Sequence, residues 1–243
     1  MIQAIVFDLD GTLVRTDTIK AQSYAQAVLE LAQANVSETA ATKAFKTVLG
    51  RSRHEIAQYL LNEFGLEPAA RERMDAYGVN TPWQAFVQIR VKIYEALLED
   101  PLVIVKHRCP YGLDVLVWAR ENGYRTGLTT MSPCRQAGRV LQILDIVDDF
   151  DFIATGDDVN VGKPDPEIYR LAIHELSVEP AEALVLENSV AGIQAAQAAG
   201  LHCIAVTSDI TRPTVQAAAL LERRWMVNRP SELKRTVKRF LKQ

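Results

Sequence analysis

The spacing of apolar residues changes twice along this chain. Residues 2–7 form a short apolar run rich in β-branched side chains, which predicts a strand buried on both faces. Between residues 17 and 100 no comparable run occurs, and apolar residues recur at helical spacing instead. From about Val103 onward, short apolar runs alternate with amphipathic stretches. The pattern predicts one strand, then a block of helices, then a series of strand–helix units.

Within the block, the periodicity predicts helices over residues 17–34, 37–49, 52–64, 70–78 and 81–100. Ser37 and Ser52 are suited to cap two of these helices, and Thr81 with Pro82 forms a good cap and first-turn pair. The later part predicts strands over residues 124–130, 151–155, 183–187 and 202–207. Its predicted helices cover residues 110–122, 133–146, 165–176, 189–200, 212–224 and 230–242.

Alternating strands and helices indicate a doubly wound parallel sheet with right-handed crossovers, an α/β fold of Rossmann-like type. The helical block interrupts this sheet after its first strand. We therefore expect an α/β core formed by residues 1–15 and 103–243, and an inserted all-helical cap domain formed by residues 16–102. In such sheets the functional site lies beyond the carboxyl ends of the strands.

Composition narrows the class of protein further. The chain has 243 residues, 48% of them hydrophobic, and a formal net charge of only −3, which is typical of a globular protein and gives no sign of a nucleic-acid partner. Its three cysteines are widely spaced and form no metal or disulfide pattern, which favours a reducing compartment. No secretory leader or run of about 18 apolar residues is evident. We expect a cytoplasmic protein with no membrane partner and no obligate protein partner.

Polar groups of complementary chemistry follow four predicted strands. Asp8 and Asp10 end the first strand and are followed at once by Gly11, although a buried strand has no structural need for two carboxylates. The other segments are "LTTMS" at residues 128–132, "VGKPDPEIY" at residues 161–169 and "VLENSVAG" at residues 185–192. Taken alone, each segment could have a purely structural role as a turn or a helix cap. Together they bring two carboxylates, a hydroxyl, an ammonium and a second acidic cluster to one edge of the sheet.

These segments resemble the four motifs of the haloacid dehalogenase-like (HAD) hydrolase superfamily, in its phosphatase and β-phosphoglucomutase-like branch with a helical cap. The resemblance covers essentially the whole chain. "FDLDGTLV", "GKPDPEIY" and "SVAGIQAAQAAG" are highly specific in that order, whereas "LTTMS" is weak on its own. The resemblance implies a Mg²⁺-dependent enzyme that transfers a phosphoryl group through an aspartyl-phosphate.

The resemblance also implies a role for each matching residue. Asp8 is the nucleophile, and Asp10 protonates the leaving oxygen and later deprotonates water. Thr130 and Lys163 bind the phosphate, and the backbone after Thr130, at Met131, assists; Gly11 permits the tight exit from the strand. The expected Mg²⁺ ligands are Asp8, Asp10 through its backbone carbonyl, Glu187 and Asn188.

Two positions depart from the family's pattern. Asn188 stands where relatives usually have a second acidic residue that binds the metal, so we expect functional but weaker Mg²⁺ binding. Arg15 stands where relatives commonly have an acid near the hinge between core and cap. A hinge role is favoured for Arg15, with contact to an anionic substrate as the alternative.

In the predicted cap, the segment "LGRSRHEI" resembles the part that carries a phosphate-binding arginine in sugar-phosphate mutases of this branch. Arg53 is the matching position and a candidate second handle for the substrate. The alternative is that Arg51 and Arg53 are simply exposed residues in the first turn of a helix.

Three functions remain open at this point. The first is a phosphatase acting on a small phosphorylated metabolite, such as a sugar phosphate or phosphoglycolate. The second is a sugar phosphomutase, which the lack of a histidine in "RTDTIKAQSY" makes less favoured. The third is a non-catalytic protein that binds a phosphorylated ligand. Dehalogenation gives Asp10 no role, because halide loss needs no proton.

Overall fold

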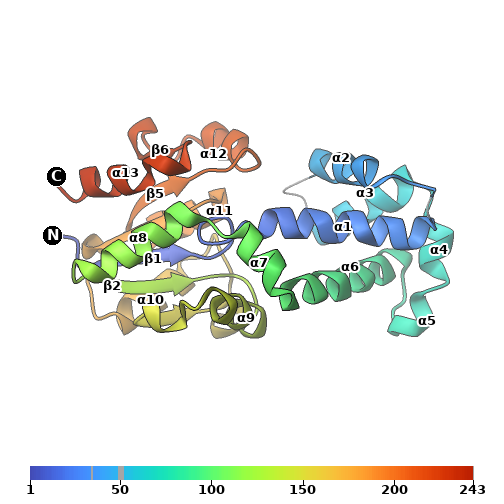
Figure 1. Ribbon diagram of the computed structural model, residues 1–243, viewed down its shortest axis with the longest axis horizontal. Coiled ribbons are helices and arrows are strands. Elements are labelled where there is room, and N and C mark those ends of the chain that lie inside the picture. The colour runs from blue at the N-terminus through green and yellow to red at the C-terminus, as the bar shows by residue number, and fades with distance from the viewer. Residues whose placement is uncertain (34, 49–51, 243) are drawn as a thin grey trace. The chain divides into compact units, whose positions relative to one another are not determined.

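The computed structural model describes residues 1–33, 35–48 and 52–242, and the chain divides into two compact units (Figure 1). One unit consists of Met1–Arg15 and Ile104–Gln243, and the other of Thr16–Val103. Over the described residues, no helix combines the length and the apolar character that a membrane span requires.

The first unit is built on a six-stranded sheet in which every neighbouring pair is parallel. The strand order is β3-β2-β1-β4-β5-β6, so the chain direction across the sheet reverses between β1 and β4. This reversal is the topological switch point where α/β sheets bind ligands. The strands are β1 (Ala4–Asp8), β2 (Arg125–Thr129), β3 (Phe152–Ala154), β4 (Ala183–Glu187), β5 (His202–Val206) and β6 (Met226–Val227).

Both faces of this sheet are covered, as the continuous apolar strands predicted. Ala4 and Val6 of β1 pack in one cluster with residues of α10 and α11. Ile5 and Phe7 point to the opposite face by strand alternation and are also fully buried. The helices of this unit are α8 (Pro110–Glu121), α9 (Cys134–Leu144), α10 (Glu167–Glu175), α11 (Val190–Ala198), α12 (Arg212–Ala218) and α13 (Leu233–Phe240). The doubly wound parallel fold expected from the sequence is therefore confirmed.

The second unit is entirely helical in its described part. Tyr24 and Phe45 stack at 4.8 Å between ring centroids, and Phe86 completes the aromatic centre of its core. Ser37 and Ser52 cap α2 and α3 as expected, and Pro82 begins α6. The helices are α1 (Thr16–Ala32), α2 (Glu38–Thr47), α3 (Arg53–Glu63), α4 (Glu67–Arg71), α5 (Met74–Tyr77) and α6 (Pro82–Glu99), and α7 (Pro101–His107) crosses the second join between the units.

Some predicted helix boundaries are wrong. The helix expected over residues 70–78 is two short helices, α4 and α5, of which α5 ends where Gly78 adopts a left-handed conformation (φ 61°). The helix expected over residues 212–224 ends at Ala218, because Ala219 is left-handed (φ 49°). α7 and β6 were not predicted at all.

Candidate active site

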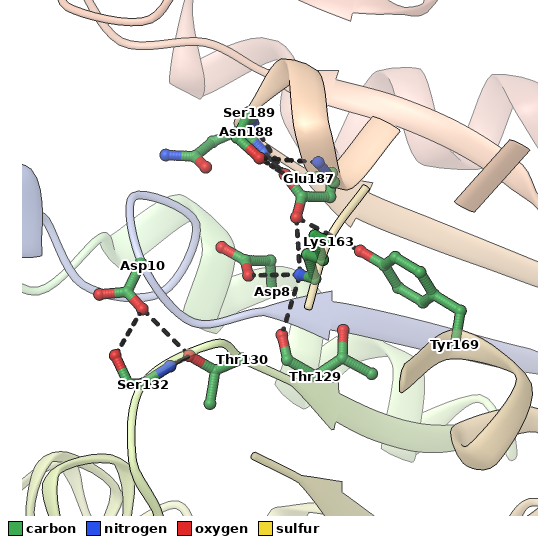
Figure 2. A network of polar contacts seen from close by, with 11 residues as sticks. Asp8, Asp10, Thr129, Thr130, Ser132, Lys163, Tyr169, Glu187, Asn188 and Ser189 are labelled. Atoms are coloured by element: carbon green, nitrogen blue, oxygen red, sulfur yellow. Dashed lines mark hydrogen bonds and ion pairs between the residues drawn. The ribbon is translucent and has the colours of Figure 1, made fainter. Parts of the chain in front are cut away.

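Asp8 ends β1 next to the switch point of the sheet, with β2 on one side and β4 on the other. Its side chain is only 7% exposed, and its Oδ1 accepts a hydrogen bond from Lys163 Nζ at 2.9 Å (Figure 2). A carboxylate this deeply buried requires a paired cation. Lys163 supplies that cation.

Lys163 also pairs with Glu187, whose Oε1 lies 2.7 Å from Nζ. The ammonium thus bridges the carboxylates of Asp8 and Glu187, which are the last residues of β1 and β4. It also donates to the carbonyl of Thr129, the last residue of β2, at 3.4 Å. The loop that carries Lys163 is fastened by Glu167, whose carboxylate accepts backbone N–H groups of Asn160 and Val161. These backbone hydrogen bonds lower the pKa of Glu167.

Glu187 is held at the start of α11. Its Oε2 accepts hydrogen bonds from the backbone N–H groups of Asn188 and Ser189, both at 2.7 Å, and from the Ser189 hydroxyl. Ser189 in turn caps α11 by accepting from Gly192 N. A methyl group on Gly192 would stand 1.8 Å from Glu187 Oε1, so only glycine leaves room for the carboxylate. In this arrangement Glu187 organises Lys163 and the helix start with both of its oxygens.

Asp10 lies on the loop after β1, and its Oδ2 accepts hydrogen bonds from the hydroxyls of Thr130 at 3.0 Å and Ser132 at 2.8 Å. Thr130 is fully buried, and its oxygen also accepts from Ser132 N. The resemblance implies that Thr130 binds a phosphate oxygen, and in the structure its hydroxyl donates to Asp10. Ser132 was not among the predicted site residues, and its place two residues after Thr130 is the signal that identifies it.

Asn188 packs against the loop of Asp8 and Asp10. Its amide Nδ2 would stand 1.7 Å from a methyl group placed on Gly11, which has a left-handed φ of 84°. Figure 2 shows this side chain extended away from Lys163. Glycine is therefore required at position 11 for two reasons: the left-handed backbone conformation and the close approach of the Asn188 side chain.

The donor set at this edge suits Mg²⁺. Asp8 and Glu187 offer carboxylate oxygens, Asp10 offers its backbone carbonyl and Asn188 its amide oxygen. Oxygen atoms of these kinds are the hard ligands that Mg²⁺ takes, and Mg²⁺ sites commonly use only one or two protein carboxylates together with waters and phosphate. Because Gly11 has no side chain, the Asn188 amide can pack closely against the loop that carries the two aspartates. Among the described residues, no group of three or more His, Cys, Asp or Glu could hold a metal.

Burial and neighbouring charges shift the pKa values of Asp8 and Lys163. Burial raises the pKa of Asp8, and the nearby charges of Glu187 and Asp10 raise it further, while Lys163 opposes them. Burial alone would lower the pKa of Lys163, but Asp8, Tyr169 and Glu187 outweigh it and the pKa is raised. Lys163 therefore stays protonated throughout the neutral range.

Tyr169 lies behind Lys163 and was missed by the sequence analysis. It is fully buried on α10, its hydroxyl donates to Glu187 Oε1 at 3.3 Å, and Lys163 Nζ lies 4.9 Å from its ring centroid. It is the last residue of the "GKPDPEIY" segment, which is the one signal that could have identified it.

The remaining predicted residues lie as follows. Met131, 39% exposed, belongs to the loop between Thr130 and Ser132, with its methyl end against Gly162. Arg15 is exposed and donates to the Lys106 carbonyl at 3.4 Å, where the chain returns to the α/β unit. Arg53 begins α3 in the helical unit. Leu49, Gly50 and Arg51 of its segment lie outside the described residues.

Arg53 is accompanied by a second cation in the helical unit. Arg90 on α6 is buried, and its Nε donates to Ser23 Oγ at 2.9 Å. Its guanidinium lies over the rings of Tyr24 (4.9 Å) and Tyr94 (4.5 Å) and pairs with no carboxylate of the described residues. Burial lowers the pKa of Arg90, and the charge of Arg53 lowers it further.

The switch point of this parallel α/β sheet therefore holds a buried Asp–Lys–Glu cluster. The model of the haloacid dehalogenase-like hydrolase family matches residues 2–200, and the chain belongs to that family. Several of its relatives are named as phosphatases, and the chain is accordingly an enzyme of the phosphatase type.

Two curated relatives and one solved structure illustrate the similarity. Protein CbbY of Cereibacter sphaeroides is 31% identical over 220 residues, which cover 87% of each chain. Phosphorylated carbohydrates phosphatase of Thermotoga maritima is 26% identical over 203 residues, 84% of each chain. A crystal structure of β-phosphoglucomutase from Clostridium difficile, 21% identical, covers 100% of both chains with a TM-score of 0.64 and shares the fold.

Proposed function

We propose that this protein is a Mg²⁺-dependent phosphoric monoester hydrolase that acts on a small phosphorylated metabolite through an aspartyl-phosphate at Asp8. The observation that carries the proposal is the buried ammonium of Lys163 bridging Asp8 and Glu187 at the switch point. The printed name of the T. maritima relative, a phosphatase of phosphorylated carbohydrates, agrees with this class of substrate. We also propose that residues 1–15 and 103–243 form the catalytic core and residues 16–102 its cap.

The chemistry follows from the charges in the site. A carboxylate oxygen of Asp8 attacks phosphorus while Lys163 offsets the repulsion between the two anions. The bond from phosphorus to the ester oxygen breaks, and Asp10 gives that oxygen a proton. Asp10 then removes a proton from water, which attacks phosphorus and releases inorganic phosphate and the free Asp8 carboxylate.

Asp10 must change protonation state in each half of this cycle. The hydroxyls of Thr130 and Ser132 both donate to Asp10 Oδ2 and so orient its carboxyl group for these transfers. Asp8, the backbone carbonyl of Asp10, Asn188 and Glu187, the last directly or through a water, would hold the Mg²⁺ ion, which when bound neutralises charge on the phosphate.

Hydrolysis of an aryl phosphate in the presence of Mg²⁺ tests the proposal. We expect Asp8→Asn and Asp10→Asn each to reduce kcat by at least about 10³-fold, because one removes the nucleophile and the other the acid and base. Asp145→Asn, an exposed substitution at the end of α9, is the matched control and should leave kcat unchanged. Turnover that survives Asp8→Asn would contradict the mechanism, and no turnover in the unaltered protein would favour a binding protein.

We further propose that the substrate carries a second anionic group, which is held by Arg53 and Arg90 of the helical unit. The support is a buried guanidinium with no carboxylate partner among the described residues, beside a second arginine. Arg53→Gln is expected to raise KM about tenfold for a sugar bisphosphate, since a charged hydrogen bond contributes about 1.5–3 kcal/mol, and to leave KM for an aryl phosphate unchanged. Arg71→Gln is the control, because its exposed ion pair with Glu67 lies elsewhere on this unit. Equal effects on both substrates would contradict the assignment.

A further inference from the structure

A hollow lies at the edge of the sheet that β6 forms. Its volume is about 380 Å³, and it is lined by Gln216 of α12 and by Arg223, Met226 and Asn228 around β6. β5 stands between β6 and β4, the strand that ends in Glu187. No lining residue belongs to the candidate active site. Its volume falls within the range of about 300–1,000 Å³ that is typical of pockets for small molecules.

Three of the four lining side chains carry hydrogen-bond donors that the fold leaves unused. Among the described residues, neither the Arg223 guanidinium nor the Gln216 amide takes part in a side-chain hydrogen bond or ion pair. Asn228 is oriented, because its Oδ1 accepts from the Thr207 hydroxyl at 3.0 Å. That bond uses the acceptor of the amide and leaves its NH₂ group available.

The charged side chains near Arg223 make contacts with other groups. Glu222, next to Arg223 in the chain, forms its ion pair with Arg224 at 2.9 Å. Arg224 and Arg239 lie over the ring of Trp225. Arg212 donates to the Asn228 carbonyl at 3.1 Å and forms an ion pair with Asp209 at 3.0 Å, while its buried Nε has no hydrogen-bond partner. Arg223 is thus an uncompensated cation at the hollow.

The surrounding segment is strongly positive although the chain as a whole is not. Residues 212–242 contain nine lysines and arginines but only two glutamates, while the formal net charge of the chain is −3. A local excess of positive charge raises the concentration of small anions near it. A guanidinium and two amides around one hollow suit a group with several acceptor oxygens.

We propose that this hollow is a second binding site, separate from the active site, for a small molecule that carries a phosphate group. Arg223 pairs with the phosphate charge, and the Gln216 and Asn228 amides donate to its remaining oxygens. The apolar side chain of Met226 packs against the organic part of the ligand.

A titration of the ¹⁵N-labelled protein with inorganic phosphate, followed by NMR, tests the proposal. The side-chain amides of Gln216 and Asn228 report on the hollow, and the backbone amides of Gly11 and Ser189 report on the active site. Sodium chloride at the same ionic strength controls for screening. We expect the two sets of signals to shift with different dissociation constants, and chloride to move neither.

Two variants and a control make the test specific. Arg223→Gln is expected to weaken binding at the hollow by about tenfold, as the loss of a charge-assisted hydrogen bond requires, and to leave the active-site signals unchanged. Gln216→Leu removes one neutral donor from an exposed position and should weaken it less. Arg235→Gln makes the same charge change within the same segment, where its 78% exposed side chain pairs with Glu232, and should have no effect. Unshifted amides at the hollow up to about 50 mM phosphate, or equal weakening by Arg223→Gln and Arg235→Gln, would overturn the proposal.

Discussion

At the scale of single residues, Tyr169 shows how the site depends on a group behind the reacting atoms. Its ring lies under the Lys163 ammonium and its hydroxyl donates to Glu187, so one side chain touches both partners of the bridging ion pair. Burial, followed by the charge of Glu187, raises the pKa of this hydroxyl, which keeps it a donor. Tyr169 is a positioning residue in our account.

Tyr169→Phe tests that role because it keeps the ring and removes only the hydrogen bond. We expect kcat for an aryl phosphate to fall about tenfold with KM unchanged, since a hydrogen bond to a charged group contributes about 1.5–3 kcal/mol. Tyr111→Phe, at a 46% exposed position, is the control. A fall in thermal stability with no change in kcat would show that the hydroxyl is merely structural.

Asn188 is a ligand in the Mg²⁺ site that we propose. Asn188→Asp adds a negative charge to the proposed ligand set, so we expect the Mg²⁺ concentration at half-maximal activity to fall, by about tenfold. Asn62→Asp makes the same change at an exposed position on α3 and controls for overall charge. An unchanged half-saturation in Asn188→Asp would exclude Asn188 from the metal site.

The sequence predicted which segments meet at the site but not every contact within them. Parallel strands bring their carboxyl ends to one edge of a sheet. The segments that follow these ends could therefore be expected to meet, and the structure does bring Asp8, Lys163 and Glu187 together. The hydrogen bond from Thr130 to Asp10 depends on the side-chain rotamers of a turn, which no pattern encodes. Tyr169 looks like a core aromatic in the sequence, because helical spacing cannot show where a buried hydroxyl points.

At the scale of elements, the start of α11 must approach the end of β4 closely. Gly192 allows this approach, since a methyl group there would stand 1.8 Å from Glu187 Oε1. We expect Gly192→Ala to displace the carboxylate and reduce both kcat and thermal stability, because overpacking costs about 1–3 kcal/mol. Gly138→Ala on α9 is the matched control: nothing lies within 4 Å of its added methyl, and it should stabilise the fold by about 0.5–1 kcal/mol. Gly192→Ala with full activity would contradict this account of the helix start.

Element boundaries were the least predictable part of the fold. β6 has two residues and pairs with β5 only at Met226 and Val227, which is too short for a periodic signal. α12 ends at a left-handed alanine, where no glycine marks the stop. The long strands and helices were predicted because their buried faces repeat over several turns or residues.

At the scale of the whole molecule, the two units have separate hydrophobic cores. The helical unit encloses Tyr24, Phe45 and Phe86, and the α/β unit encloses the cluster around Val6, Tyr169 and Val185. Phe86→Ala should therefore destabilise the helical unit by about 3–5 kcal/mol. Hydrogen exchange measured by mass spectrometry should become faster in the peptides of α1 and α6 and stay unchanged in those of β1 and β4. Equal acceleration in both units would contradict separate cores.

The central claim is that phosphorus becomes bonded to Asp8 during turnover. The most direct measurement is to quench the enzyme with acid while it hydrolyses an aryl phosphate, digest it and locate the added phosphoryl group by mass spectrometry. Our account predicts the group on the peptide that contains Asp8, and its absence from Asp8→Asn. Continued turnover with no phosphorylated peptide, or with the group on any other residue, would contradict it.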